Sequence, residues 1–177
     1  FVGDKGSFVK HTFNLETHFE KKIYKYSEEL FRGSSITRWA PLLIDRLSDE
    51  GVKPDSLIVS HNLHDWWVVE VELARRSKLN DMRDQTGKLS RVNYSLHQVS
   101  IKKGLRDMGL SGDLEEMSKR LSSTPPKFLL IIDEDDENFR REAAFNGFST
   151  LVIEPFATQQ GNIRFRIPSE QVFTVEQ

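Results

Sequence analysis

Two glutamates, Glu70 and Glu72, lie within an otherwise apolar run of eight residues from Trp66 to Leu73. Aromatic and β-branched residues dominate this run, which predicts a strand. Side chains on a strand alternate between its two faces, so both carboxylates point the same way. Like charges this close repel each other, and apolar surroundings disfavour their ionised forms. A bound cation, or a cluster of arginines and lysines, would relieve both costs, which makes the pair a candidate metal site.

The same residues have simpler interpretations. Glu70 and Glu72 could face water on the exposed side of an antiparallel sheet, where polar and apolar residues alternate. The dipeptide Pro54-Asp55, which precedes this strand by a hairpin-length gap, is common in turns. Glu20 lies on a predicted helix and could be a solvated surface residue. Taken singly, none of these acids requires a functional role.

Length and composition indicate one folded domain. The chain has 177 residues, of which 37% are hydrophobic and 10% aromatic, enough for a single core. Its sequence has no apolar run near the ~20 residues of a membrane span and no signal-peptide pattern. It lacks cysteine, which excludes disulfides and thiolate zinc sites and favours a cytoplasmic location. Because the chain begins at Phe1, we expect a piece of a longer protein.

Charge is unevenly distributed, although the net charge is only −2. Between Arg75 and Arg106 there are nine lysines or arginines and two acids, whereas the segment from Asp45 to Glu72 has seven acids and two bases. Such a basic segment is either an ordinary charged surface or a contact for nucleic-acid phosphates.

Hydrophobic periodicity and turn signals predict an α/β fold with a mixed central sheet flanked by helices. A first helix begins after Asn14 and ends before Gly33, and the polar stretch from Asp81 to Leu89 is predicted to be a loop. Residues 41–47 favour a short strand, although 36–47 could equally be helical. The other predicted helices cover 91–108, 113–121 and 137–146, and the first of these is expected to have Val92, Leu96 and Val99 on its inner face. The other predicted strands cover 55–60, 66–73, 128–132, 150–153 and 163–167.

In this order of elements, Pro54-Asp55 followed by Glu70-Val71-Glu72 resembles the motif of the PD-(D/E)XK nuclease superfamily. That superfamily has a restriction-endonuclease-like αβββαβ core, with an aspartate starting the second strand and an acid-x-lysine on the third. Glu20 is similar to the helical glutamate of Mrr-type and Holliday-junction-resolvase-type members. The resemblance covers about residues 15–154, and the sequence as a whole is similar to the nuclease domains of Shedu-type phage-defence proteins.

The resemblance implies a Mg²⁺ or Mn²⁺ site in which Asp55, Glu70 and Glu72 are ligands and Glu20 acts through water, all four being catalytic residues. Glu72 occupies the position of the motif's lysine and could accept a proton or hold a second ion. Residues 15–177 would form a single nuclease-like domain, with 1–14 as an N-terminal extension. The basic residues expected to contact DNA phosphates are Arg75, Arg76, Lys78, Lys88, Lys102 and Lys103.

The function implied by the resemblance is metal-dependent cleavage of DNA in phage defence or DNA processing. DNA is the expected partner, a homo-oligomer is left open, and no membrane contact is expected. The missing lysine keeps a second hypothesis open, in which the same fold is catalytically inactive and binds nucleic acid or protein. A third is an unrelated α/β interaction domain whose acids lie on the surface.

Overall fold

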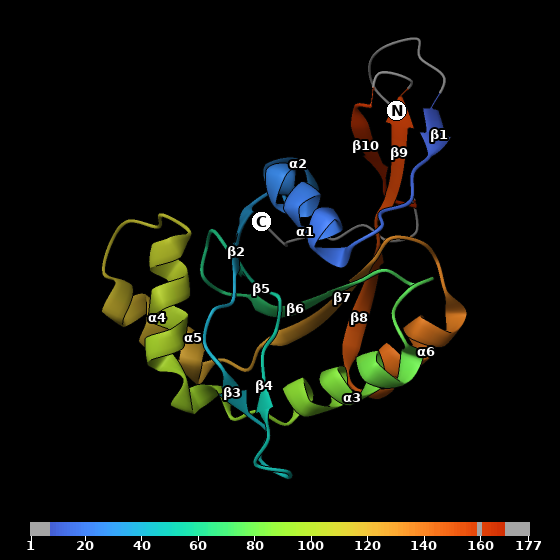
Figure 1. Cartoon of the computed structure of the whole chain (residues 1–177). Coiled ribbons are helices and arrows are strands. Elements are labelled where there is room, and N and C mark those ends of the chain that lie inside the picture. The colour runs from blue at the N-terminus through green and yellow to red at the C-terminus, as the bar shows by residue number, and fades with distance from the viewer. Residues whose placement is uncertain (1–7, 159–160, 169–177) are drawn as a thin grey trace.

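A five-stranded mixed sheet forms the centre of the molecule (Figure 1). The computed structural model describes residues 8–158 and 161–168. The first three strands of the sheet pair antiparallel and the last three pair parallel. In spatial order the strands are β2 (Ser34–Arg38), β5 (Ser56–Ser60), β6 (Trp66–Glu72), β7 (Lys127–Ile132) and β8 (Phe148–Val152). The predicted α/β class, with a mixed sheet between helices, is confirmed.

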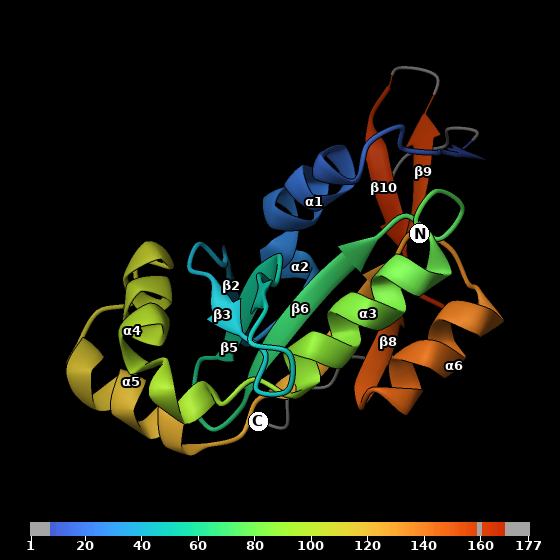
Figure 2. The same ribbon diagram turned by 60° about the horizontal axis from the view of Figure 1, so that its bottom comes forward.

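Helices cover both faces of this sheet, and a small second sheet projects beyond it (Figures 1 and 2). One face packs on α3 (Leu79–Ser90), α4 (Gln98–Asp107), α5 (Leu114–Ser123) and α6 (Glu137–Phe145). The other packs on α1 (Glu16–Lys25) and α2 (Ser27–Leu30). The second sheet contains β1 (Phe8–Lys10), β9 (Glu154–Thr158) and β10 (Ile163–Arg166), and the remaining elements are β3 (Leu43–Ile44), β4 (Gly51–Val52) and the 3₁₀ turn η1 (Tyr94–Leu96).

Strand β6 is buried on both faces, as expected for a strand between two helical layers. Trp66 and Val68 belong to the core beneath α3 to α6, whereas Trp67, Val69 and Val71 belong to the core beneath α1 and α2. This division has the two-residue period predicted for the strand. Glu70 and Glu72 therefore lie in the row that faces α3.

The prediction of a loop at Asp81–Leu89 is wrong, because this stretch lies inside α3. Its inner face consists of Met82, Thr86 and Leu89, which recur at helical spacing and are fully or almost fully buried. Only two of these three residues are strongly apolar, and the outward positions are polar or charged. The hydrophobic signal is therefore too weak to distinguish this helix from a loop by sequence alone.

The helix predicted at 91–108 begins later, at Gln98, and follows the turn η1. Leu96 and Val99 were expected to face inward, but they are 77% and 83% exposed. The buried residues of α4 are instead Ile101, Gly104 and Leu105. A Cβ on Gly104 would lie 2.7 Å from Leu57, so glycine permits the close approach of α4 to β5.

Three smaller points concern the first helix, the stretch from residue 36 to residue 47, and strand β9. The helix predicted before Gly33 is divided at Tyr26 into α1 and α2, and Gly33 has a positive φ of 77°. The short strand favoured at 41–47 is present as β3, whereas the helical alternative for 36–47 is wrong, because this stretch begins with the end of β2. Strand β9 was not predicted, and it pairs with β1. No helix within residues 8–158 or 161–168 combines the length and apolar character needed to cross a membrane.

Candidate metal centre

Asp55 lies where strands β5 and β6 separate. The pairing of these strands begins at Ser56 opposite Val69, and the Asp55 N–H donates to the Val69 carbonyl at 3.1 Å. Beyond that point the Asp55 side chain replaces the strand backbone, because its Oδ2 accepts the Val71 N–H at 2.8 Å. The carboxylate is thereby fixed beside the last residues of β6.

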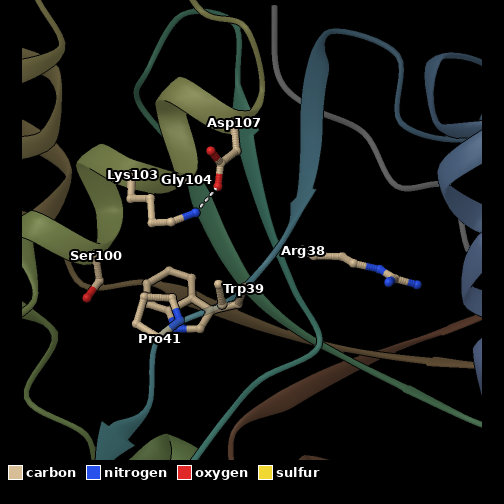
Figure 3. A pocket seen from close by; sticks show the side chains of 8 residues that line it. Arg38, Trp39, Pro41, Ser100, Lys103, Gly104 and Asp107 are labelled. Carbon is tan, nitrogen blue, oxygen red and sulfur yellow. Dashed lines mark hydrogen bonds and ion pairs between the residues drawn. The ribbon is translucent and has the colours of Figure 1, made fainter.

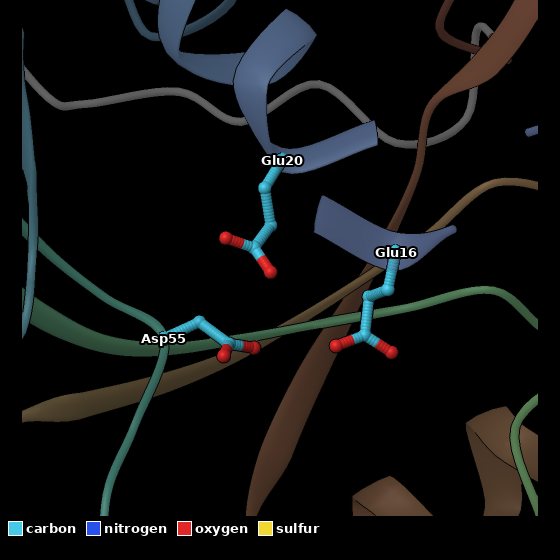
Figure 4. A group of neighbouring side chains, drawn as sticks. All are labelled: Glu16, Glu20 and Asp55. Atoms are coloured by element: carbon cyan, nitrogen blue, oxygen red, sulfur yellow. The ribbon is translucent and has the colours of Figure 1, made fainter. Parts of the chain in front are cut away.

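Helix α1 brings two further carboxylates to Asp55. Glu16 and Glu20 are four residues apart and so lie on one face of the helix. Together with Asp55 they form a group in which one oxygen from each residue lies within 4.8 Å of the others (Figure 4). Glu20 was among the predicted catalytic residues, but Glu16 was missed, although its spacing to Glu20 is a readable signal.

Glu70 extends the acidic group into the interior. Its residue is 1% exposed, and its Oε2 accepts a hydrogen bond from Gln85 Nε2 at 2.5 Å. Its Oε1 is buried and, among the described residues, makes no hydrogen bond of normal geometry. Burial raises the pKa of Glu70 well above its usual value, and the nearby Asp55 carboxylate adds to this. Sequence reasoning missed Gln85 because its helix, α3, was predicted to be a loop.

Three further acids, Glu16, Asp55 and Glu72, also resist ionisation. Burial, with smaller contributions from Glu72 and Asp55, raises the pKa of Glu16 to about 8. Burial raises the pKa of Asp55 to about 7 and outweighs the opposing hydrogen bond from Val71. Burial likewise raises the pKa of Glu72, which hydrogen bonds to Ser77 and Glu16. Without a cation, these acids therefore favour their protonated forms near neutral pH.

We use "acidic cluster" for the five residues Glu16, Glu20, Asp55, Glu70 and Glu72. The predicted ligands Asp55, Glu70 and Glu72 all belong to it, but the tightest group pairs Asp55 with the two glutamates of α1. Hard carboxylate oxygens are the donors that Mg²⁺ and Mn²⁺ prefer. Within the part of the chain that the structure describes, the buried Glu70 Oε1 has no hydrogen-bond donor, so the residues present fit a divalent cation.

The six predicted DNA-contacting residues do not form one surface. Arg75, Arg76 and Lys78 follow β6 directly, near the acidic cluster, whereas Lys102 and Lys103 lie on α4, across the molecule (Figure 2). Most of them have partners. Arg75 pairs with Glu134, Arg76 donates to Asn14, Lys88 pairs with Glu50 and Asp84, Lys102 pairs with Glu115, and Lys103 pairs with Asp107.

A shallow hollow between β2 and α4 is separate from the acidic cluster. It encloses about 170 Å³, part of which is open to solvent, and its lining includes Trp39, Ser100 and Lys103. The Arg38 side chain points away from these residues (Figure 3). Arg38 instead reaches the acidic cluster, where it pairs with Glu20 at 3.5 Å.

Searches of protein-family models, of curated proteins and of solved structures each returned no match. The interpretation of the acidic cluster therefore depends on its own geometry and on the resemblance carried by its motif.

Replacing Gln85 with alanine is expected to destabilise the fold by about 1–3 kcal/mol, because a buried oxygen of Glu70 then loses its hydrogen bond. Urea denaturation without divalent ions measures the change. Gln98→Ala is the matched control, since Gln98 donates at 2.8 Å to the exposed Glu115 and only at 3.4 Å to Ser118, whose hydroxyl also donates to the Glu115 carbonyl, and it should cost less than about 0.5 kcal/mol. Equal stabilities for the two variants would contradict the contact between Gln85 and Glu70.

Proposed function

We propose that this chain is a nuclease-like domain that hydrolyses DNA phosphodiester bonds with Mg²⁺ or Mn²⁺ held in the acidic cluster. The observation that carries the proposal is the convergence of Glu16, Glu20 and Asp55, with the buried Glu70 beside them, where β5 and β6 separate. Five carboxylates in one small volume are costly without a cation.

The order of elements supports this proposal. Helix α1 precedes the antiparallel strands β2, β5 and β6, and further helices lead to β7, which pairs parallel to β6. The same order, αβββαβ, is expected from the resemblance to the PD-(D/E)XK superfamily. The β3–β4 hairpin is an insertion between β2 and β5. Asp55 directly precedes the second strand of this series and Glu70 lies on the third, which is close to the arrangement expected from the motif.

The chain's own residues have separable roles in such a reaction. A divalent cation bound here would neutralise charge on the reacting phosphate and make bound water more acidic. Asp55, Glu16 and Glu20 would hold that cation, and Gln85 fixes the orientation of Glu70. Glu72, whose pKa is raised by burial, would accept a proton from the attacking water in its ionised form.

A second candidate function is a catalytically inactive binding module with the same fold. It is favoured by Glu72, which occupies the lysine position and hydrogen bonds to Ser77 and Glu16. Under either function, the resemblance to Shedu-type proteins suggests a role in phage defence or DNA processing.

Incubation of the protein with supercoiled plasmid and linear DNA tests the catalytic proposal. We expect nicking or cleavage with Mg²⁺ or Mn²⁺, none with EDTA, and strong loss of activity in Glu72→Gln. If no divalent ion supports cleavage while Mn²⁺ still raises the melting temperature, the inactive binding module is the better description. If Mn²⁺ causes neither effect, the acidic cluster is not a metal site.

Charge reversal of Arg76 and Lys78 is expected to weaken DNA binding and to lower the slope of log K against log salt by about 2, because two fewer phosphate contacts are made. Fluorescence anisotropy over a salt series, with Ca²⁺ in place of Mg²⁺, measures this slope. Reversal of Lys102 and Lys103, which already pair with acids on α4 and α5, is expected to change it less. The opposite ranking would place the DNA on the α4 surface.

A further inference from the structure

The acidic cluster needs a positive charge that its motif does not supply. In the resembling superfamily a lysine lies at the position of Glu72, and a carboxylate there cannot stabilise negative charge on a reacting phosphate. Among the described residues, Arg38 and Lys53 interact with acids of the cluster. Arg38 pairs with Glu20, and the charge of Lys53 lowers the pKa of Asp55.

Strand β2 places Arg38 directly beside Asp55. Arg38 is the last residue of β2 and pairs in register with Ser56, and the next residue, Trp39, donates its N–H to the Asp55 carbonyl at 3.0 Å. The backbone of Arg38 is therefore attached to the strand that carries the aspartate. Its side chain extends along the side of the sheet on which Glu20 lies.

Two contacts orient the guanidinium. It stacks over the ring of Tyr24, 5.3 Å from the ring centroid, and it donates one hydrogen bond to Glu20. Tyr24 is itself fixed, because its hydroxyl hydrogen bonds to Ser56. A guanidinium has five N–H donors. The side chain of Arg38 is 57% exposed, so donors that do not bond to Glu20 are accessible to a ligand.

Arginine at this place suits a phosphate better than Lys53 does. Its planar fork can donate two parallel hydrogen bonds to phosphate oxygens, and stacking on Tyr24 reduces the freedom lost on binding. Lys53 is exposed, and within the described residues no hydrogen bond or ion pair fixes its ammonium group. A single carboxylate at 3.5 Å is also a weak partner that a phosphate can displace.

We propose that Arg38 is a catalytic residue of this domain, which donates hydrogen bonds to the non-bridging oxygens of the scissile DNA phosphate and supplies the positive charge that Glu72 cannot. This inference rests on the proposed nuclease function. It assigns the transition-state charge to an arginine from the edge strand β2 rather than to the third strand of the motif. Because the contact strengthens as charge develops on the phosphate, it acts mainly on the rate of cleavage.

Cleavage of a DNA duplex with Mn²⁺ tests this role in Arg38→Ala and Arg38→Lys. We expect Arg38→Ala to lower kcat by about 100-fold or more, and Arg38→Lys to recover part of the loss. The Kd for DNA with Ca²⁺ should change less than about threefold, and the rise in melting temperature caused by Mn²⁺ should persist. Arg141→Ala is the matched control, because Arg141 is an exposed arginine of α6 with a carboxylate 4.0 Å away, and its kcat should equal that of the wild type.

The outcomes separate this inference from the proposed function. If the wild type cleaves and Arg38→Ala cleaves equally well, the role of Arg38 is refuted and the nuclease proposal survives. If Arg38→Ala weakens DNA binding but leaves kcat unchanged, Arg38 contacts a flanking phosphate, which also refutes the inference. If Lys53→Ala, and not Arg38→Ala, lowers kcat, Lys53 supplies the charge. If the wild type is inactive with every divalent ion, both proposals fail.

Discussion

Replacing Asp55 with asparagine is expected to reduce DNA cleavage by at least about a thousandfold and to abolish the stabilisation by Mn²⁺. A thousandfold loss corresponds to about 4 kcal/mol of transition-state stabilisation, which is within the several kcal/mol that a bound cation contributes. Asparagine keeps an oxygen that can accept the Val71 N–H, now 2.8 Å from Asp55 Oδ2. The ion-free fold should therefore be as stable as the wild type or more so, because repulsion within the acidic cluster falls.

Initial cleavage rates and melting temperatures, each with and without Mn²⁺, measure these effects. Asp107→Asn is the control, because Asp107 is an exposed acid on α4 that pairs with Lys103. It should retain both the activity and the response to Mn²⁺. Cleavage that survives Asp55→Asn would show that the phosphodiester is hydrolysed elsewhere or by a contaminant.

The ion-free protein is expected to lose stability between about pH 4 and pH 8, and Glu16→Gln should reduce this loss. Burial raises the folded-state pKa values of Asp55 and Glu16 to about 7 and about 8, above unfolded values of about 4. The folded state thus binds more protons in this window, so its stability falls as pH rises. Below about pH 4 both states are protonated and the difference disappears.

Glu16→Gln is expected to raise the melting temperature at pH 8 by about 2–4 °C. This corresponds to about 1 kcal/mol once the partial exposure of Glu16 is taken into account. At pH 4 the variant should match the wild type. The half-buried His97 has a pKa lowered by burial and opposes the trend, since its contribution grows as pH rises to about 6.5. Subtracting the melting temperature of the wild type from that of the variant at each pH removes the contribution of His97.

Calorimetric scans from pH 4 to pH 8 with EDTA measure these shifts, and Glu29→Gln on the exposed surface of α2 is the control. A Glu16→Gln variant that gains nothing at pH 8 relative to this control would contradict the crowding of acids at the cluster. Addition of Mn²⁺ should stabilise the wild type more at pH 8 than at pH 5, because the ligands must lose their protons to bind it.

The central features of the site could be predicted from sequence because they depend on short-range periodicity. The alternation along β6 places Glu70 and Glu72 on one face whatever the rest of the fold does. The position of Asp55 beside them needs only that the next strand back pairs as a hairpin, and β5 does so. The mixed sheet likewise follows from strong apolar runs separated by helical patterns.

Residues brought in by other elements could not be placed in this way. Gln85 lies on a helix whose inner face has too few large apolar side chains to reveal its period. Glu16 and Arg38 reach the acidic cluster from α1 and β2, and only the packing of those elements against β5 determines that approach. Leu96 and Val99 were assigned to the inner face of a helix by their spacing, yet tertiary packing selects Ile101 and Leu105 instead.

A crystal structure of the protein grown with Mn²⁺, with anomalous scattering recorded at the manganese edge, tests the metal site most directly. The structure described here predicts an anomalous peak bound by Asp55 together with carboxylates of α1, beside the unpartnered oxygen of Glu70. Ordered side chains at these positions with no anomalous peak between them, or a peak bound only by other residues, would contradict the proposed metal centre.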